Sequence, residues 1–321
     1  TPHASRFTVL HVPTPDYEGG LETGYAKAIE ALILMAEKSY GALRNLTTYG
    51  RAFAAHISPL EERRINVIVG HHLTPADFYE LREIIESFGL TPIMLPDLSC
   101  LDGSRTEFSA LASGGTSIEE IKAMGSSEFT LAVGGCMESA AEILQERFGI
   151  QYRVFESIAG IEDTDSFMET LQMLGCGYIP KKYERQRKSL IDGMRDAQFY
   201  LNGKKICTAM EPDLSVQTSH WLYEAGYEIE LAVIPQHSLN TSSIAAKKVI
   251  IGDISMIDGE FDLLISNSHA EDTARDMGIP LYELGFPSYK TMGAGSKITI
   301  GYRGTLNLIN ETTSLIMKKS H

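Results

Sequence analysis

Short apolar runs alternate with longer amphipathic stretches along most of this chain. The runs are rich in β-branched and other apolar residues and are bounded by turn-forming residues, a pattern that predicts buried strands. The strands predicted in this way cover residues 7–12, 65–70, 90–95, 129–133, 205–210, 228–234, 248–251 and 262–266.

Between these runs, apolar residues recur every three or four positions, which predicts helices with one buried face. One helix start is marked strongly, because Thr74 supplies an N-cap, Pro75 the first helical position and Asp77 an acid in the first turn. A second capped helix is predicted to start at Thr116. The other predicted helices cover 21–38, 137–148, 180–201, 213–225 and 305–318.

Alternating strands and helices with short links predict an α/β fold with parallel sheets flanked by helices. A length of 321 residues suits about two domains. We expect two Rossmann-like domains, at residues 65–179 and 203–321, joined by a linking helix at 180–202. Residues 1–64 begin without Met and run straight into an apolar segment, so we expect them to be a connector and the remnant of a third, N-terminal domain.

Charge and composition exclude several classes of protein. The net charge is −14, whereas nucleic acids and anionic membrane surfaces call for basic patches. No apolar run approaches the ~18 residues of a membrane span, and no signal peptide is visible. We therefore expect a cytoplasmic protein with reduced thiols. The four cysteines, Cys100, Cys136, Cys176 and Cys207, form no C-x-x-C pair, so the sequence assigns no metal ligand.

The common catalytic motifs are missing from the sequence. No G-x-G-x-x-G follows a predicted strand, and no Walker-type phosphate loop is present. The zinc-protease motif H-E-x-x-H and the hydrolase motif G-x-S-x-G are also absent. The sequence therefore assigns no catalytic residue.

Ligands of open parallel sheets bind beyond the carboxyl ends of the strands, and this rule selects the candidate residues. His71 and His72 could instead form a solvated turn, and Asp213 could be a simple N-cap. The cofactor-binding candidates in a cleft between the two domains are His72, Asp213, Asn267, Ser268 and His269. Further strand-end residues with the same placement are Asp97, Cys136, Glu211 and Asp253.

Several segments, in order, resemble the nitrogenase component 1 family. The first is the T-P-x-[FY]-x-G type segment at residues 13–25, and another is the helix start Gly-Gly-Thr-Ser-Ile-Glu-Glu at 114–120. Two elements, Leu-Pro-Asp-Leu-Ser at 95–99 and Glu-Pro-Asp-Leu at 211–214, are similar to the NifN-type branch of that family. The remaining matching segments are 72–77, 101–103, 267–269, 285–287 and 301–305.

This resemblance implies a subunit of a NifEN-type scaffold on which the iron-molybdenum cofactor precursor is matured for nitrogen fixation. It implies a heterotetramer with a NifE-type subunit and transient docking of the nitrogenase iron protein. An interfacial [4Fe–4S] cluster is held in that family by cysteines of the first domain, so no cofactor is assignable to this chain.

Two other functions stay open. The first is the β subunit of nitrogenase or of a related reductase, and the second is a two-domain solute or metallocofactor binder of the periplasmic type.

Overall fold

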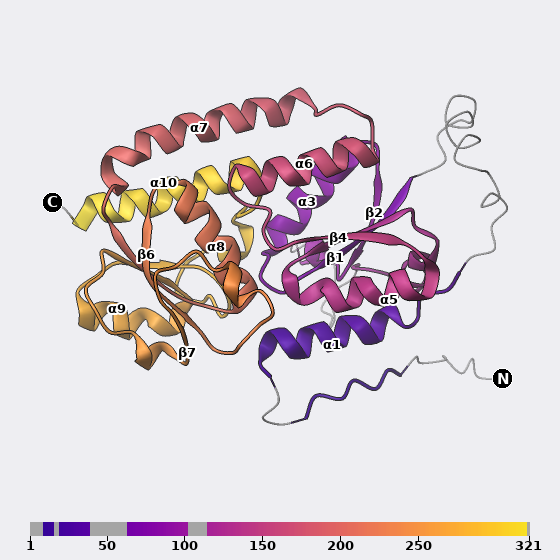
Figure 1. Cartoon of the computed structure of the whole chain (residues 1–321), viewed down its shortest axis with the longest axis horizontal. Coiled ribbons are helices and arrows are strands. Elements are labelled where there is room, and N and C mark those ends of the chain that lie inside the picture. Colours follow the sequence, from indigo (N-terminus) through magenta and orange to yellow (C-terminus); the bar gives the residue numbers. More distant parts are fainter. Residues whose placement is uncertain (1–8, 16–18, 39–62, 102–113, 320–321) are drawn as a thin grey trace.

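The computed structural model describes residues 9–15, 19–38, 63–101 and 114–319 of the chain. Two parallel sheets lie side by side, with helices covering them (Figure 1). The first has the strand order β2-β1-β3-β4 and the second β7-β6-β5-β8-β9. The strands are β1 Arg64–Val69, β2 Thr91–Leu95, β3 Phe129–Val133, β4 Gln151–Phe155, β5 Lys205–Ala209, β6 Glu228–Ile234, β7 Val249–Ile251, β8 Leu263–Ser266 and β9 Leu281–Glu283.

The helices follow the strands in the order that a parallel sheet requires. The fold class, an α/β protein with two parallel sheets flanked by helices, is confirmed. The domain boundaries themselves stay a prediction. The α-helices are α1 Leu21–Ile33, α3 Pro75–Ser87, α4 Ile118–Ala123, α5 Glu138–Phe148, α6 Glu162–Leu174, α7 Lys181–Leu201, α8 Pro212–Glu224, α9 Glu271–Met277 and α10 Gly301–Lys319.

The predicted cap of α3 is confirmed in both directions. The Asp77 backbone N–H donates to the Thr74 hydroxyl (3.1 Å), and the Thr74 backbone N–H donates to the Asp77 carboxylate (2.9 Å). The same carboxylate also accepts the Thr299 N–H (2.6 Å) and hydroxyl (2.7 Å). Since Thr299 lies just before α10, the cap also ties the first sheet's helix to the C-terminal part of the chain.

The long helix α7 joins the two sheets and packs along α10 (Figure 1). Its near-heptad apolar positions are its buried residues, as the spacing predicts. These are Tyr183, Leu190, Met194, Ala197 and Leu201. They belong to an apolar core that also contains Val67 of the first sheet and Ile206 of the second. The two sheets therefore share one continuous core.

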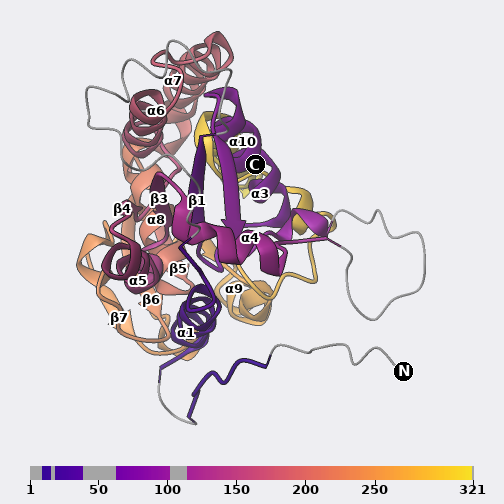
Figure 2. The same ribbon diagram turned by 90° about the vertical axis from the view of Figure 1, so that its right-hand side faces the viewer.

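The helix α1 packs against α5 below the first sheet in both views (Figure 2). Arg147 of α5 donates to the carbonyl oxygens of Ile33, Leu34 and Ala36, where α1 ends (3.0–3.2 Å). These carbonyls would otherwise lack partners at a helix C-terminus. The contact fixes the C-terminal end of α1 against the end of α5.

The structure corrects some expected elements. Residues 9–12 of the predicted strand 7–12 have no strand conformation, and Val9 is 87% exposed. No described strand pairs with them, and an apolar run forms a strand only when its backbone groups find a partner. Most of the expected connector, residues 39–62, lies outside the described residues. Four elements were missed: β4, α6, α9 and β9. Within the described chain, no helix combines the length and the apolar character that a bilayer crossing needs.

Candidate functional site

The strand ends of the first sheet meet the start of α8 from the second sheet. The Asp213 carboxylate, in the first turn of α8, accepts the backbone N–H groups of Gly135 (2.9 Å) and Cys136 (3.2 Å), which follow β3. It also accepts the Asn240 side-chain amide (2.7 Å), from the loop after β6. Asp213 is fully buried. One carboxylate therefore joins three segments: the start of α8, the turn after β3 and the loop after β6. The interpretation of Asp213 as a simple N-cap is wrong, because Glu211 is the N-cap residue of α8.

A glycine makes the close approach at this point. Gly134 has φ +100°, a conformation that side chains disfavour. A Cβ at this position would lie 2.6 Å from the Asp213 Oδ2 and 3.0 Å from the His72 Cε1. Because no side chain fills that space, the His72 ring and the Asp213 carboxylate come together across Gly134. Two of the five cofactor-binding candidates are thus neighbours, and the solvated-turn interpretation of His72 is wrong because only 8% of it is exposed.

Two buried side chains beside Asp213 have few or no hydrogen-bond partners. Glu22 of α1 is 2% exposed, and its carboxyl oxygens have no partner among the described residues other than the neighbouring side chains of Asp213 and Cys136. Both ring nitrogens of His72 have no partner there. Ligand atoms of Glu22, Cys136 and Asp213 all lie within 4.8 Å of one another. Buried polar atoms without partners are uncommon in folded proteins and call for a physical explanation.

The charges in this cluster are set by burial. Burial, together with the nearby Asp213 charge, raises the pKa of Glu22 to about 9. Burial also raises the pKa of the Cys136 thiol, and the Asp213 charge adds to this. For Asp213 itself, burial alone would raise the pKa, but the neighbouring His72 and hydrogen bonds from Cys136, Glu22 and Asn240 bring it below its usual value. At neutral pH, Asp213 therefore carries the negative charge of the cluster, while Glu22 and Cys136 are protonated.

A cleft of about 470 Å³ opens beside the cluster, and Gly135 and Asn240 line it. Arg153 of β4, Asp163 of α6 and His220 of α8 also line it. The lining of this cleft is mostly polar and comes from both sheets. We expect such a cleft between the two domains.

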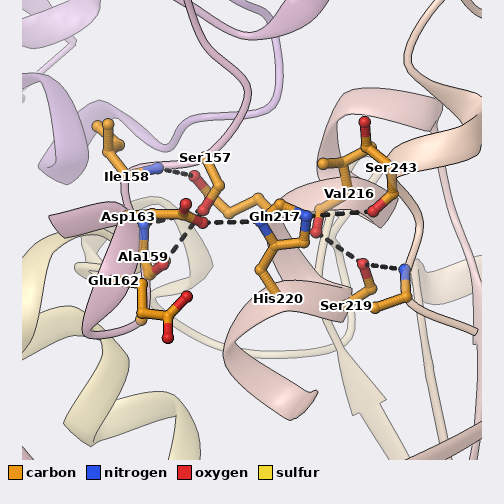
Figure 3. Close-up of polar contacts among 12 residues, drawn as sticks. Ser157, Ile158, Ala159, Glu162, Asp163, Val216, Gln217, Ser219, His220 and Ser243 are labelled. Carbon is orange, nitrogen blue, oxygen red and sulfur yellow. Dashed lines mark hydrogen bonds and ion pairs between the residues drawn. The ribbon is translucent and has the colours of Figure 1, made fainter. Parts of the chain in front are cut away.

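An ion pair crosses this cleft wall (Figure 3). The His220 Nδ1 lies 2.8 Å from the Asp163 Oδ2, and its Nε2 lies 3.1 Å from the Ser243 carbonyl oxygen. A carbonyl can only accept, so Nε2 must carry a proton, and the carboxylate favours a second proton on Nδ1. The hydrogen bond with Asp163 accordingly raises the pKa of His220. The pair joins α6 to α8 across the boundary between the sheets.

The other three cofactor-binding candidates lie at the end of β8 and contact residues of the nearby loops. The Asn267 carboxamide accepts the His269 N–H (3.0 Å), and the Ser268 hydroxyl accepts the Tyr289 N–H (2.9 Å). His269 is exposed, with its ring 6.0 Å from that of Tyr289. No contact among the described residues joins these three to His72 or Asp213. Their role in binding a cofactor stays a prediction.

Sequence reasoning missed Glu22 and Asn240. A signal for Glu22 exists, because the buried face of α1 is Glu22, Ala26, Ile29 and Ile33. An acid in the apolar stripe of a helix is unusual and indicates a special environment. Asn240 carries no comparable signal, since its position depends on the path of the loop after β6.

Comparisons with known proteins agree with this architecture. The family model of nitrogenase component 1 type oxidoreductases matches residues 2–317. The chain is 36% identical to the nitrogenase iron-molybdenum cofactor biosynthesis protein NifN of Bradyrhizobium diazoefficiens, with 98% of this chain and 66% of that protein covered. It is 35% identical to the NifN protein of Rippkaea orientalis, with 98% and 70% covered.

A solved structure described as nitrogenase Cp1 at pH 6.5 superposes with a TM-score of 0.85 at 29% identity, over 97% of this chain and 68% of that one. The chain thus spans about two thirds of the length of the relatives that it matches. With the family model covering nearly every residue, the chain belongs to the nitrogenase component 1 type oxidoreductase family, as a NifN-type member.

Proposed function

We propose that this chain is part of a NifEN-type scaffold subunit, which holds and matures the iron-molybdenum cofactor precursor in the cytoplasm. The observation that carries the proposal is the 36% identity to a NifN protein across 98% of the chain. Its partner would be a NifE-type subunit, in a heterotetramer to which the nitrogenase iron protein docks transiently. In this proposal the precursor is the cargo of the complex.

The geometry supports a wall of a binding site better than a centre of turnover. The Asp213 carboxylate, the one ionised group of the buried cluster, is engaged by two backbone N–H groups and one amide. A carboxylate held in this way stabilises a loop and is a weak general base, because its lone pairs are already used. The polar cleft beside it is shaped by both sheets, which suits a surface that closes over cargo held in part by a partner.

An iron–sulfur cluster with several cysteine ligands does not fit the described residues. The group of three metal-capable side chains found among them contains a single cysteine, Cys136. The other three cysteines are separated along the fold, with Cys207 buried in β5 and Cys176 exposed. The [4Fe–4S] cluster of the family is therefore assigned no ligand here, and His72, Asp213, Asn267, Ser268 and His269 stay candidates for contacts to the precursor.

The alternative function is the β subunit of nitrogenase itself or of a related reductase. The NifN relatives do not favour it. Iron content separates the two functions. The nitrogenase subunit pair carries a cluster of about eight irons at its interface, as the family resemblance implies, and the scaffold pair would carry the smaller [4Fe–4S] cluster there.

The test uses the complete protein co-purified with its NifE-type partner after loading with precursor. We expect the complex to restore substrate reduction when mixed with cofactor-deficient nitrogenase component 1, iron protein and ATP, and to reduce little substrate alone. For the site, His269→Ala is expected to lower this transfer without lowering the melting temperature. His237→Ala, at another exposed histidine, is the matched control and should leave transfer unchanged. A complex that reduces substrate unaided and cannot restore the deficient component would overturn the proposal.

A further inference from the structure

Three segments that are distant in the sequence bring metal-capable side chains together at the boundary between the sheets. Glu22 comes from α1, Cys136 from the turn after β3, and Asp213 from α8. Their ligand atoms all lie within 4.8 Å of one another, and Glu22 and Asp213 are almost fully buried. Such a cluster is not by itself a site, because buried acids also occur in protonated, structural arrangements.

His72 supplies an independent indication of a ligand. Its side chain is more than nine-tenths buried, and neither ring nitrogen has a partner among the described residues. Its ring faces the same space over Gly134 as the Asp213 carboxylate does. Glu22 has only the side chains of this same cluster, Asp213 and Cys136, as hydrogen-bonding neighbours. The unpartnered His72 ring therefore faces the carboxylate around which Glu22 and Cys136 gather, and a cation in this small volume would satisfy all four side chains.

We propose that Glu22, Cys136, Asp213 and His72 bind one divalent transition-metal ion, of the Zn²⁺ or Fe²⁺ class. The inference does not rest on the scaffold function, since it concerns only the side chains of this chain. In a tetrahedral site, metal–sulfur distances of about 2.3 Å and metal–oxygen distances of about 2.1 Å place ligands roughly 3.5 Å apart. The ligand atoms of Glu22, Cys136 and Asp213 lie within 4.8 Å of one another, so rotamer shifts of about 1 Å would bring these three to that spacing. His72, whose ring lies over Gly134, would turn toward them to supply the fourth ligand.

The donor set selects the class of metal. A thiolate and an imidazole are ligands for zinc, iron and cobalt, whereas calcium and magnesium take oxygen ligands. Metal binding would displace the protons of the Glu22 carboxyl and the Cys136 thiol, leaving three anionic donors and one neutral donor around a double positive charge. The hydrogen bonds that the Asp213 carboxylate accepts from the Gly135 and Cys136 backbone N–H groups would then hold this ligand in its orientation toward the metal.

The experiment uses Co²⁺ as the probe and the complete protein in its complex, after removal of weakly held metal by dialysis against a chelator. Optical titration should show one Co²⁺ per chain, with a thiolate-to-cobalt charge-transfer band in the near ultraviolet. Cys136→Ser should abolish that band, and Glu22→Gln should weaken Co²⁺ affinity roughly tenfold or more. Cys176→Ser changes an exposed cysteine outside the cluster and is the matched control, expected to match the wild type.

The two cluster variants keep the result interpretable. The amide of Gln can still donate to the Asp213 carboxylate, as the protonated Glu22 carboxyl does, so Glu22→Gln should fold even where Cys136→Ser does not. Absence of stoichiometric Co²⁺ binding, or equal binding in Glu22→Gln and the wild type, would overturn the proposal and leave the cluster as a protonated structural contact. A charge-transfer band that persists in Cys136→Ser and disappears in Cys176→Ser would place the metal elsewhere and overturn it as well.

Discussion

Replacing Asp213 by alanine should destabilise this protein severely, because one buried carboxylate holds three segments together. The change leaves the N–H groups of Gly135 and Cys136 and the amide of Asn240 without their acceptor. Each buried group left unpaired costs about 1–3 kcal/mol, so three of them set a scale of at least about 3 kcal/mol. Removing one partner from a buried charged network costs about 3–5 kcal/mol by direct measurement in other proteins. We expect a loss of about 3–5 kcal/mol.

The assay is thermal unfolding of the complete protein, with chelator present so that no bound metal contributes to its stability. At this chain length a loss of 1 kcal/mol lowers the midpoint by about 2 °C, so the expected fall is about 6–10 °C. The matched control is Asp253→Ala, just after β7, where the exposed carboxylate accepts hydrogen bonds from the nearby Ser255. Its shift should be much smaller. An unchanged or raised midpoint for Asp213→Ala would show that the buried carboxylate gives no net stabilisation, and that its three hydrogen bonds do not hold the segments together.

Two further changes test the same boundary. Gly134→Ala places a Cβ against Asp213 and His72 at a positive φ. It should lower the free energy of unfolding by at least about 2 kcal/mol more than Gly149→Ala, because Gly149 also has a positive φ (+72°) but lies in open surroundings. Equal losses of unfolding free energy in urea would contradict the close packing at Gly134. The His220–Asp163 pair raises the pKa of His220, so its stabilisation is present below about pH 6.5 and is lost as pH rises through the raised pKa. The midpoint difference between wild type and His220→Gln should therefore shrink from pH 6 to pH 9, and a difference that is constant with pH would argue against an ionised pair.

Much of the fold could be predicted because local signals agreed with the tertiary structure. The span 129–133 was predicted and observed as β3, since its apolar run is buried between two neighbouring strands. The start of α3 could be predicted because three helix-start signals, Thr74, Pro75 and Asp77, lie within four residues. These elements depend on burial patterns that the sequence displays directly.

The missed elements lie where burial is partial. β4 is at the edge of the first sheet and alternates exposed and half-buried positions, so its Gln-Tyr-Arg-Val-Phe sequence lacks an apolar run. β9 is a three-residue edge strand. For α6, the spacing of Phe167, Met168 and Leu171 did carry a helical signal, which its acidic first turn obscured.

The candidate site was predictable only in part. The strand-end rule selected His72, Cys136 and Asp213, and the structure brings all three together. The same rule selected Asn267 and His269, which the structure holds apart at β8. Strand ends of one sheet are adjacent by topology, whereas the approach of two sheets depends on how α7 and α10 pack. That packing has no local signature in the sequence.

Deleting the gene in a nitrogen-fixing cell distinguishes a maturation scaffold from a nitrogenase subunit. For a scaffold, we expect that the extract lacks substrate reduction and regains it when isolated iron-molybdenum cofactor is added, because the nitrogenase polypeptides themselves are intact. An extract that stays inactive after cofactor addition, and regains activity only with purified component 1, would show that the chain is a nitrogenase subunit and not a maturation scaffold.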